Sequence, residues 1–351
     1  MPIPLIASDH HLAHDGLVEL VAGQPIPCYE SPQRATVIRE ALLATGDYVL
    51  EPPVDHGPDP IAAVHEVELI DLVEHAWTDA VAGGRDPSRP LLPDTFLLGA
   101  YAAGMTLERL PAARHDRLGA YCFDTATPIV AGTAAAARAA VDIALTAVDR
   151  VLAGEPLAYG LCRPPGHHAG HATYGGYCFL NNAALAAQYL RDAGCARVAV
   201  LDVDYHHGNG TQDIFYARGD VLTVSIHGTP DTEYPWFLGY DDERGSDAGE
   251  GCNLNLPLPL GTGWDAYDTA LGTALEAIAR FAPSALVVSL GVDTYAGDPI
   301  SAFALEQMHF PLLGKRIGGL GLPTVLVQEG GYAVEEIGTN VVGVLGGFLS
   351  A

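Results

Sequence analysis

RVAVLDVDYHHGNG, residues 197–210, joins an apolar run to a dense group of polar side chains. The run from 197 to 203 carries Val, Ala and Leu without strict polar alternation, which is typical of a parallel strand buried on both faces. Asp204 and His206 follow two positions apart, so near a strand end their side chains project the same way. The stretch therefore predicts a parallel strand whose end carries functional groups.

Four further apolar runs resemble this strand and alternate with helical patterns. They are LAYGLC (157–162), VLTVSIH (221–227), ALVVSLGV (285–292) and TVLVQE (324–329). The segments 132–154 and 181–194 have the periodicity of helices. Strands that alternate with helices predict an α/β fold with a central, mainly parallel β-sheet flanked by helices. Because no repeat or shift in composition divides the chain, we expect one domain over residues 1–351.

The composition is that of an acidic globular protein. The chain has 351 residues, 17 Lys and Arg against 43 Asp and Glu, and a net charge of −26. This charge argues against nucleic acid or an anionic membrane as partner. It would concentrate cationic small molecules or serve general solubility, and charge alone does not decide between the two. The six cysteines form no CxxC pair, and no stretch approaches the ~20 apolar residues of a membrane span. We expect reduced thiols and a cytoplasmic protein.

Polar residues follow each of the five predicted strands. Ligands of open parallel sheets bind beyond the carboxyl ends of the strands, so these residues are expected to converge. They are His167 and His168, then Asp202, Asp204 and His206, then Ser225 and His227, then Asp293, and finally Gly330, Gly331 and Tyr332. Convergence of five strand ends predicts a site at this edge of the sheet.

Asp204, His206 and Asp293 are the predicted ligands of one metal ion. One imidazole and two carboxylates suit Zn²⁺, with Fe²⁺, Co²⁺ or Mn²⁺ as alternatives. Three protein ligands leave positions open for water and substrate. The mutual repulsion of carboxylates crowded at one strand end also favours a bound cation.

The tandem histidines in RPPGHHAGH (163–171) are then free to transfer protons. Asp202 and Asn209 are the candidates that orient them. We expect His168 beside Asn209 to be the neutral base, and His167 beside Asp202 to stay cationic. Tyr332, which follows two glycines, is placed to donate to a developing oxyanion.

These motifs together resemble the zinc-dependent histone deacetylase superfamily and, within it, the bacterial acetylpolyamine amidohydrolases. The family segments LCRPPGHHAGHATYGGYCFLNNAA, LDVDYHHGNGTQDIFY, VSIHG, VSLGVDTYAGDPIS and EGGY occur in order and cover essentially the whole chain. The acetylpolyamine branch is suggested by YPWFLGYDDERG (234–245), FDTATPIVAGT (123–133) and SDHHLAHDG (8–16).

The resemblance implies an arginase/deacetylase-like three-layer fold and removal of acetyl or acyl groups from small amines, above all acetylpolyamines. It implies zinc on the three predicted ligands, proton transfer by the tandem histidines, and an electrophilic tyrosine. It also implies a substrate tunnel and a structural potassium ion. The substrate-binding residues are Tyr177, Tyr234, Gly176 and Ile300. The potassium residues are Asp202, Asp204, His206, Ser225 and Ile226.

Other features concern the entrance. The stretch 76–118 resembles the insertion that narrows the entrance in this branch, and predicts an entrance or oligomer loop and a homodimer. Ile300 stands where eukaryotic polyamine deacetylases have an acidic gatekeeper, so an ammonium group needs another partner. Glu66 and Asp116 are the candidates. The cluster from Asp9 to His14 is either a second metal site or a loop at the rim.

Three alternative functions stay open. A protein-lysine deacetylase would differ at the rim and not in the chemistry. An arginase-like ureohydrolase needs two metal ions and further bridging carboxylates, where this chain has Gly208 and Gly291. A non-catalytic acyl-ligand binder would have signalled itself by losing Tyr332 or a tandem histidine, and this sequence keeps them all.

Overall fold

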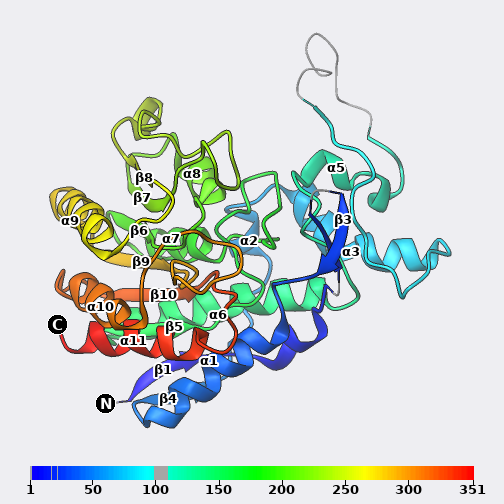
Figure 1. Cartoon of the computed structure of the whole chain (residues 1–351). Coiled ribbons are helices and arrows are strands. Elements are labelled where there is room, and N and C mark those ends of the chain that lie inside the picture. The colour runs from blue at the N-terminus through cyan, green and yellow to red at the C-terminus, as the bar shows by residue number, and fades with distance from the viewer. Residues whose placement is uncertain (1, 17, 22, 99–109) are drawn as a thin grey trace.

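The computed structural model describes residues 2–16, 18–21, 23–98 and 110–351 (Figure 1). Its centre is an eight-stranded sheet in the order β4, β1, β5, β10, β9, β6, β7, β8, with every neighbouring pair parallel. The strands are β1 (Ile3–Ile6), β4 (Tyr48–Glu51), β5 (Leu157–Gly160), β6 (Val198–Asp202), β7 (Val221–Gly228), β8 (Asn253–Leu258), β9 (Ala285–Leu290) and β10 (Thr324–Gln328).

Helices cover both faces of this sheet. On one face the long helices are α3 (Val67–Ala82), α6 (Thr133–Leu152) and α7 (Asn182–Asp192). On the other they are α1 (Pro32–Thr45), α9 (Trp264–Phe281), α10 (Phe310–Gly318) and α11 (Ile337–Leu349). The predicted α/β class and three-layer arrangement are confirmed.

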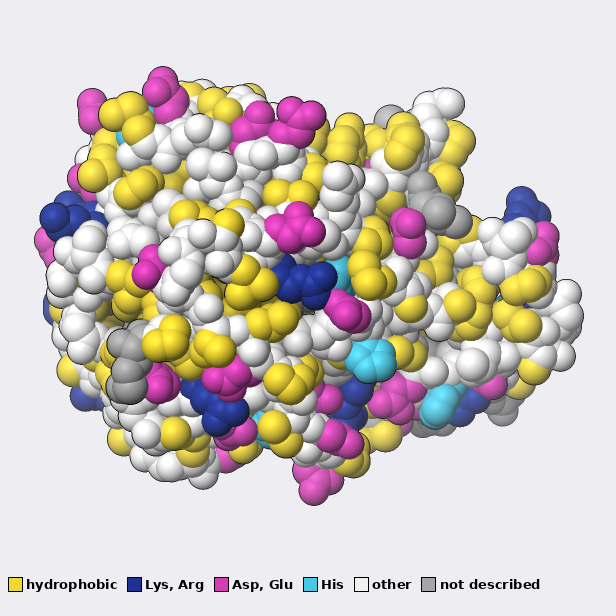
Figure 2. Space-filling view, turned by 90° about the horizontal axis from the view of Figure 1, so that it is seen from below, with side chains coloured by type: hydrophobic (Ala, Val, Ile, Leu, Met, Phe, Trp, Pro, Cys, Tyr) yellow, Lys and Arg dark blue, Asp and Glu magenta, His cyan; other side chains and the backbone are white. Residues whose placement is uncertain are grey.

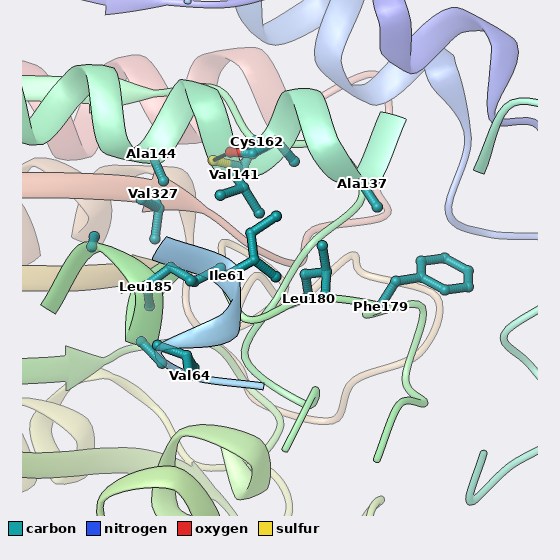
Figure 3. Close-up of a cluster of buried hydrophobic side chains, with 14 of the residues drawn as sticks. Ile61, Val64, Ala137, Val141, Ala144, Cys162, Phe179, Leu180, Leu185 and Val327 are labelled. Carbon is teal, nitrogen blue, oxygen red and sulfur yellow. Dashed lines mark hydrogen bonds between the residues drawn. The ribbon is translucent and has the colours of Figure 1, made fainter. Parts of the chain in front are cut away.

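The alternation of strand side chains creates two cores. Val198 and Val200 of β6 join the cluster beneath α6 and α7, whereas Ala199 and Leu201 join the cluster beneath α9 to α11. Strands with both faces buried need apolar residues at successive positions, which explains the unbroken runs in the sequence. Figure 3 shows one part of the first core, where side chains of α6 point toward Val327 of β10.

The remaining elements lie in the connections. The hairpin of β2 (Val18–Val21) and β3 (Gln24–Pro27) is antiparallel and separate from the main sheet. In Figure 1 it lies on the same side of the molecule as α3 and α5 (Leu118–Tyr121). The short helices α2 (Asp59–Ala62) and α8 (Asn209–Phe215) and the 3-10 turns η1 (Asp9–Ala13), η2 (Arg114–Asp116), η3 (Asp247–Gly249) and η4 (Gln307–His309) complete the described part.

The predicted entrance stretch 76–118 begins inside a helix, because α3 continues to Ala82. After it the chain is irregular and touches the body through a bridge between Leu91 and Ile129. Residues 99–109 of this stretch lie outside the described residues. Beyond them Arg114 returns to α3, where its Nε lies 2.6 Å from Asp71 Oδ2 and its Nη1 contacts Asp79.

The surface and the cysteines agree with the composition. Acidic, basic and hydrophobic side chains are interspersed on the face seen in Figure 2. All six cysteines are free thiols. Among the helices that the structure describes, none combines the length and apolar character needed to cross a bilayer.

Candidate active site

The site forms where the carboxyl ends of neighbouring strands meet. β5, β10, β9, β6 and β7 are consecutive in the sheet, so the loops that follow them open on the same edge. The loop after β5 carries the tandem histidines, and the loop after β6 carries Asp204 and His206. The loops after β9 and β10 bring Asp293 and Tyr332.

Asp204, His206 and Asp293 form a buried cluster in which one ligand atom of each lies within 4.8 Å of the others. His206 Nδ1 is 3.3 Å from Asp204 Oδ1 and 3.0 Å from Asp293 Oδ2. Backbone amides occupy the outer oxygens: Gly330 N donates to Asp204 Oδ2 (2.7 Å), and Tyr205 N donates to Asp293 Oδ1 (2.8 Å). The carboxylates are therefore fixed with one oxygen each turned toward the imidazole.

This donor set fits a divalent cation. Burial and the adjacent Asp204 carboxylate raise the pKa of Asp293 to about 7, so two negative charges here are costly without a cation. The surrounding backbone leaves room only for glycine. A Cβ at Gly291 would lie 2.0 Å from Asp204 Oδ2, and one at Gly330 would lie 2.6 Å from Asp293 Oδ2. Nitrogen and oxygen donors in this combination suit zinc and its first-row neighbours.

The tandem histidines lie beside this cluster, both buried, with their ring centroids 4.0 Å apart. Each ring has the partner named from the sequence. His167 Nδ1 lies 2.9 Å from Asp202 Oδ2, and His168 Nδ1 lies 2.6 Å from Asn209 Oδ1. Both partner oxygens are acceptors, so Nδ1 donates in each pair and Nε2 is left for chemistry.

The two rings differ in charge because their partners differ. Although burial opposes the charged form, the Asp202 and Asp204 carboxylates raise the pKa of His167 to about 10. Burial and the neighbouring His167 and His206 rings lower the pKa of His168 well below its usual range. A cationic ring and a neutral ring thus stand side by side, which is the arrangement that an acid and a base require.

A cavity of about 350 Å³ opens over these groups. His168, His206 and Tyr332 form its inner part. All four predicted substrate-binding residues line it, namely Tyr177, Tyr234, Gly176 and Ile300. Aromatic rings pack together in this lining: the Tyr177 ring centre lies 5.7 Å from that of Tyr332, and the Tyr234 ring centre lies 5.1 Å from that of His168.

Tyr332 is held from below by residues that the sequence did not reveal. Arg34 of α1 lies with its guanidinium carbon 4.6 Å from the centre of the Tyr332 ring. The same guanidinium donates to Gly331 O (2.5 Å) and Glu329 O (2.6 Å), and pairs with Glu30 at 2.8 Å. Burial raises the pKa of Tyr332 well above its usual value, so the phenol stays protonated and can donate. No sequence motif predicts that Arg34 of α1 contacts Tyr332 in the loop after β10.

The acidic side chains at the cavity are not those proposed from the sequence. Glu66 is paired loosely with His171 at 3.9 Å, and Asp116 with His115 at 3.6 Å. Among the described residues the cavity is lined instead by Glu19 of β2 and Asp124. In the sequence, Glu19 stands out only as an acidic residue within a short apolar run, and Asp124 only as a member of the segment 123–133.

Two other histidine groups have structural partners. The backbone N–H of His171 donates to Asp213 Oδ2 (2.8 Å), and its Nδ1 is 2.7 Å from Val64 O. In the N-terminal cluster, His14 Nδ1 is 3.0 Å from Thr133 Oγ1, and Arg163 donates to the carbonyl oxygens of His11 and His14. Within the described ranges this cluster supplies no group of three converging ligands.

The residues expected around potassium lie on two paired strands and the loop after one of them: Asp202 ends β6, Asp204 and His206 follow it, and Ser225 and Ile226 lie within β7. Asp202 of β6 is the register partner of Ser225 of β7, and Ile226 follows directly. Asp204 N donates to Asp202 Oδ1 at 3.1 Å, which folds the chain sharply after the strand.

Comparison with known proteins supports the same interpretation. The histone deacetylase domain model matches residues 28–347. This chain belongs to the histone deacetylase family. Acetylpolyamine amidohydrolase 1 of Pseudomonas aeruginosa is 50% identical over 349 residues, which is 99% of each chain. The acetylpolyamine amidohydrolase of Mycoplana ramosa is 42% identical over 343 residues, covering 98% of each.

Solved structures agree with the sequences. A crystal structure of acetylpolyamine aminohydrolase from Burkholderia pseudomallei matches with a TM-score of 0.92 and 40% identity, over 99% of this chain and 98% of that one. The predicted bacterial acetylpolyamine amidohydrolase branch of the histone deacetylase family is confirmed. Membership in the family implies an amidohydrolase that uses a divalent metal ion.

Proposed function

We propose that this histone deacetylase family member hydrolyses the amide bond of small acetylated amines, above all acetylpolyamines. The observation that carries the proposal is a cavity lined by His168, His206 and Tyr332. Asp204 and Asp293 are buried against His206, and the charged His167 is buried against His168. The 50% identity to an acetylpolyamine amidohydrolase over nearly the full chain supports this substrate class.

Asp204, His206 and Asp293 would hold the metal, which we propose to be zinc. When bound, zinc supplies Lewis-acid polarisation of the amide carbonyl and makes water more acidic. The protein's part is to keep the three donors dry and fixed, through the backbone amides of Gly330 and Tyr205. Iron(II) or cobalt(II) would suit the same donors.

His168 would accept the proton of the attacking water at Nε2. Its Nδ1 proton is engaged with Asn209 Oδ1, so Nε2 is the basic nitrogen. His167, held cationic by Asp202, would protonate the leaving amine. One proton is taken from water and one is delivered to nitrogen, and the new carboxyl group passes its proton to the amine, so the products are acetate and the protonated amine. Transfer of the proton from His168 to His167 then restores both rings for the next turnover.

Tyr332 would donate its phenolic proton to the developing oxyanion. Arg34 beneath the ring and the bond from Tyr332 N to Asp298 Oδ2 (2.6 Å) restrict where the hydroxyl can lie. Tyr177, Tyr234, Gly176 and Ile300 would enclose the acyl group and the chain that follows it. Their narrow, largely apolar wall favours a thin and flexible substrate.

The binuclear alternative is disfavoured by the backbone. A second ion of the arginase type would need carboxylates at positions 208 and 291. A Cβ at Gly208 would lie 2.2 Å from Asp202 Oδ2, and one at Gly291 would lie 2.0 Å from Asp204 Oδ2. Neither position has room for a side chain while the neighbouring aspartates stay where they are.

Other sequence predictions stay predictions. Asp202, Asp204, His206, Ser225 and Ile226 are proposed to hold a structural potassium ion, supported by the pairing of the strands that carry them. A homodimer is also proposed. It is supported by three exposed leucines of the 76–118 stretch, Leu97, Leu98 and Leu110. One domain over 1–351 and a cytoplasmic location are likewise untested.

The decisive experiment compares kcat/KM for acetylputrescine, acetylspermidine and an acetyl-lysine peptide, with metal analysis of the same preparation. We expect the acetylpolyamines to be preferred and about one divalent ion per chain. Higher kcat/KM on the peptide would favour a protein-lysine deacetylase. Absence of turnover on all three in metal-replete protein would leave the non-catalytic ligand binder.

A further inference from the structure

The segment 123–133 has no part in the chemistry proposed above, yet it lies at the cavity wall. Asp124 Oδ2 accepts hydrogen bonds from Gly176 N (2.6 Å) and from the Tyr234 hydroxyl (2.9 Å). Gly176 belongs to the loop after β5, whereas Tyr234 belongs to the loop after β7. One carboxylate oxygen therefore joins two loops that are 58 residues apart.

Both partners of Asp124 pack on the His168 ring. Gly176 has φ +57°, and a Cβ there would lie 2.1 Å from His168 Cδ2, so its backbone is pressed against the imidazole. The Tyr234 ring meets the same imidazole edge to face, with centroids 5.1 Å apart and planes at 88°. His168 is thus confined by two groups that share Asp124 as their anchor.

Asp124 itself is held in place by its own segment. Its Oδ1 accepts from Ala126 N (3.1 Å), and the Thr127 hydroxyl donates to Oδ2 (3.3 Å). Thr127 Oγ1 in turn accepts from Tyr177 N (2.9 Å). The carboxylate is therefore a fixed acceptor, and a charged acceptor holds its donors more firmly than a neutral one.

We infer that Asp124 is a positioning residue for the His168 base, acting through Gly176 on one side of the ring and Tyr234 on the other. The effect of this role on turnover rests on the proposed function. Its effect on the position of the His168 ring rests on the packing alone. Asn209 fixes the far nitrogen of His168, and Asp124 fixes the plane of the ring. Small displacements of a catalytic group lower turnover strongly, by about 10²-fold for 1 Å.

The test compares Asp124→Ala with Asp124→Asn. The alanine variant should lose about 10- to 100-fold in kcat on acetylputrescine while retaining the wild-type metal content. The asparagine variant should recover most of the loss, because its amide oxygen can still accept from both Gly176 N and Tyr234. Asp142→Ala is the matched control, since Asp142 also accepts a backbone N–H, that of His56, but lies outside the cavity lining.

Tyr234→Phe separates the two contacts. If Asp124 acts through both, Asp124→Ala should cost less in the Tyr234→Phe background than in the wild type, because one contact is already lost. Fully additive losses, or an alanine variant with unchanged kcat, would overturn the inference. A loss of kcat equal to that of Asp142→Ala would also overturn it, as a general loss of stability.

A second readout does not depend on activity. In ¹⁵N-histidine spectra of the metal-loaded protein, assigned with His168→Ala, the His168 ring signals should shift and broaden in Asp124→Ala, and those of His56 should not. If wild-type protein is inactive on all acetylated amines but these spectra change as expected, the proposed function fails and the positioning role stands. Unchanged His168 signals refute the positioning role.

Discussion

The floor of the cavity and its rim are built in different ways. On the floor, Asp204 and Asp293 are fully buried and each has a carboxylate oxygen bonded to a backbone amide. The rim is the loop after β7 that follows Tyr234 of the cavity lining. There Phe237 is 88% exposed and Trp236 is 48% exposed, and both residues have positive φ values. The floor is fixed by the sheet, whereas the tip of the rim is fixed mainly by its own loop.

The rim loop is nevertheless tied down at its base. His227 Nε2 lies 2.9 Å from Gly239 O, and Gln212 donates to Glu243 Oε2 at 2.6 Å. Residues 236–238 and 240–242 of this loop are exposed, on either side of the buried Gly239. From this comparison we expect the proposed reaction to depend on the buried loops at the edge of the sheet, and the choice of substrate to depend on the exposed loop after β7. Substitutions of the floor residues should therefore lower kcat greatly. A change in salt concentration, which acts on the charge around the entrance, should change kcat/KM only modestly.

The largest effect is expected from Asp204→Ala. Removing one of the two carboxylates among the three ligands should release the metal and reduce turnover by at least about 10³-fold. Metal analysis and steady-state kinetics on the purified variant measure both consequences. A variant with one equivalent of zinc and normal turnover would mean that the ligands are wrongly assigned, and that the floor does not hold the metal.

The tandem histidines should differ from each other within the floor. His168 must be neutral and its pKa is low, whereas His167 must be cationic and its pKa is about 10. Activity should therefore rise as His168 loses its proton, stay level through neutral pH, and fall as pH approaches 10. Each single alanine variant should lose about 10²- to 10⁴-fold in kcat and lose a different limb of the profile.

Asn209→Asp sharpens this difference. A carboxylate beside His168 should raise its pKa by about one unit or more, so the acid limb should move to higher pH while the alkaline limb stays. The kcat profile between about pH 5 and 10 measures the shift. Identical profiles in Asn209→Asp and the wild type would refute the assignment of His168 as base.

Tyr332→Phe should lower kcat by about 10²- to 10³-fold, the usual loss of one oxyanion donor, with little change in metal content. The ring should keep its place over Arg34, because that contact does not need the hydroxyl. An unchanged kcat with a raised KM would instead make Tyr332 part of the binding wall.

The smallest effect concerns the rim and the field around it. The net charge of −26 should attract a cationic acetylpolyamine, so kcat/KM should fall by a few-fold as NaCl rises from 0.05 to 0.5 M. Neutral N-acetylated amines of the same length are the control and should change little. Equal salt dependence for both substrates would show that charge steering plays no part.

The floor was predictable from the sequence, and much of the rim was not. Asp204, His206, His168 and Tyr332 follow apolar runs, and the rule for strand ends brings such residues together whatever the detailed packing. The five strands predicted from apolar runs are present. The strands β1, β4 and β8 were missed, although β5 is no longer than β1 or β4. β1 and β8 include a proline, β8 alternates polar and apolar residues, and β4 and β8 are the edge strands of the sheet.

The residues that support the site could not be read from the chain. Arg34 reaches Tyr332 from another helix, and Asp124 meets Gly176 and Tyr234 from a loop, at separations that no periodicity encodes. The acidic residues at the cavity were misjudged for the same reason. Glu66 and Asp116 were named on charge alone, whereas Glu19 reaches the cavity because a hairpin outside the main sheet carries it there.

Trp236 gives the rim an optical property. It is one of three tryptophans, and its ring lies 5.6 Å from that of Tyr234, which contacts the His168 imidazole. None of the three belongs to the cavity lining, but the ring of Trp236 contacts that of Tyr234, which does. Trp77 packs instead against the core beneath α6, and Trp264 stacks on His309 of η4. The intrinsic fluorescence of the protein should therefore contain one component that responds when a molecule enters the cavity and two that form a constant background. Occupancy of the cavity can then be followed without a label and without turnover.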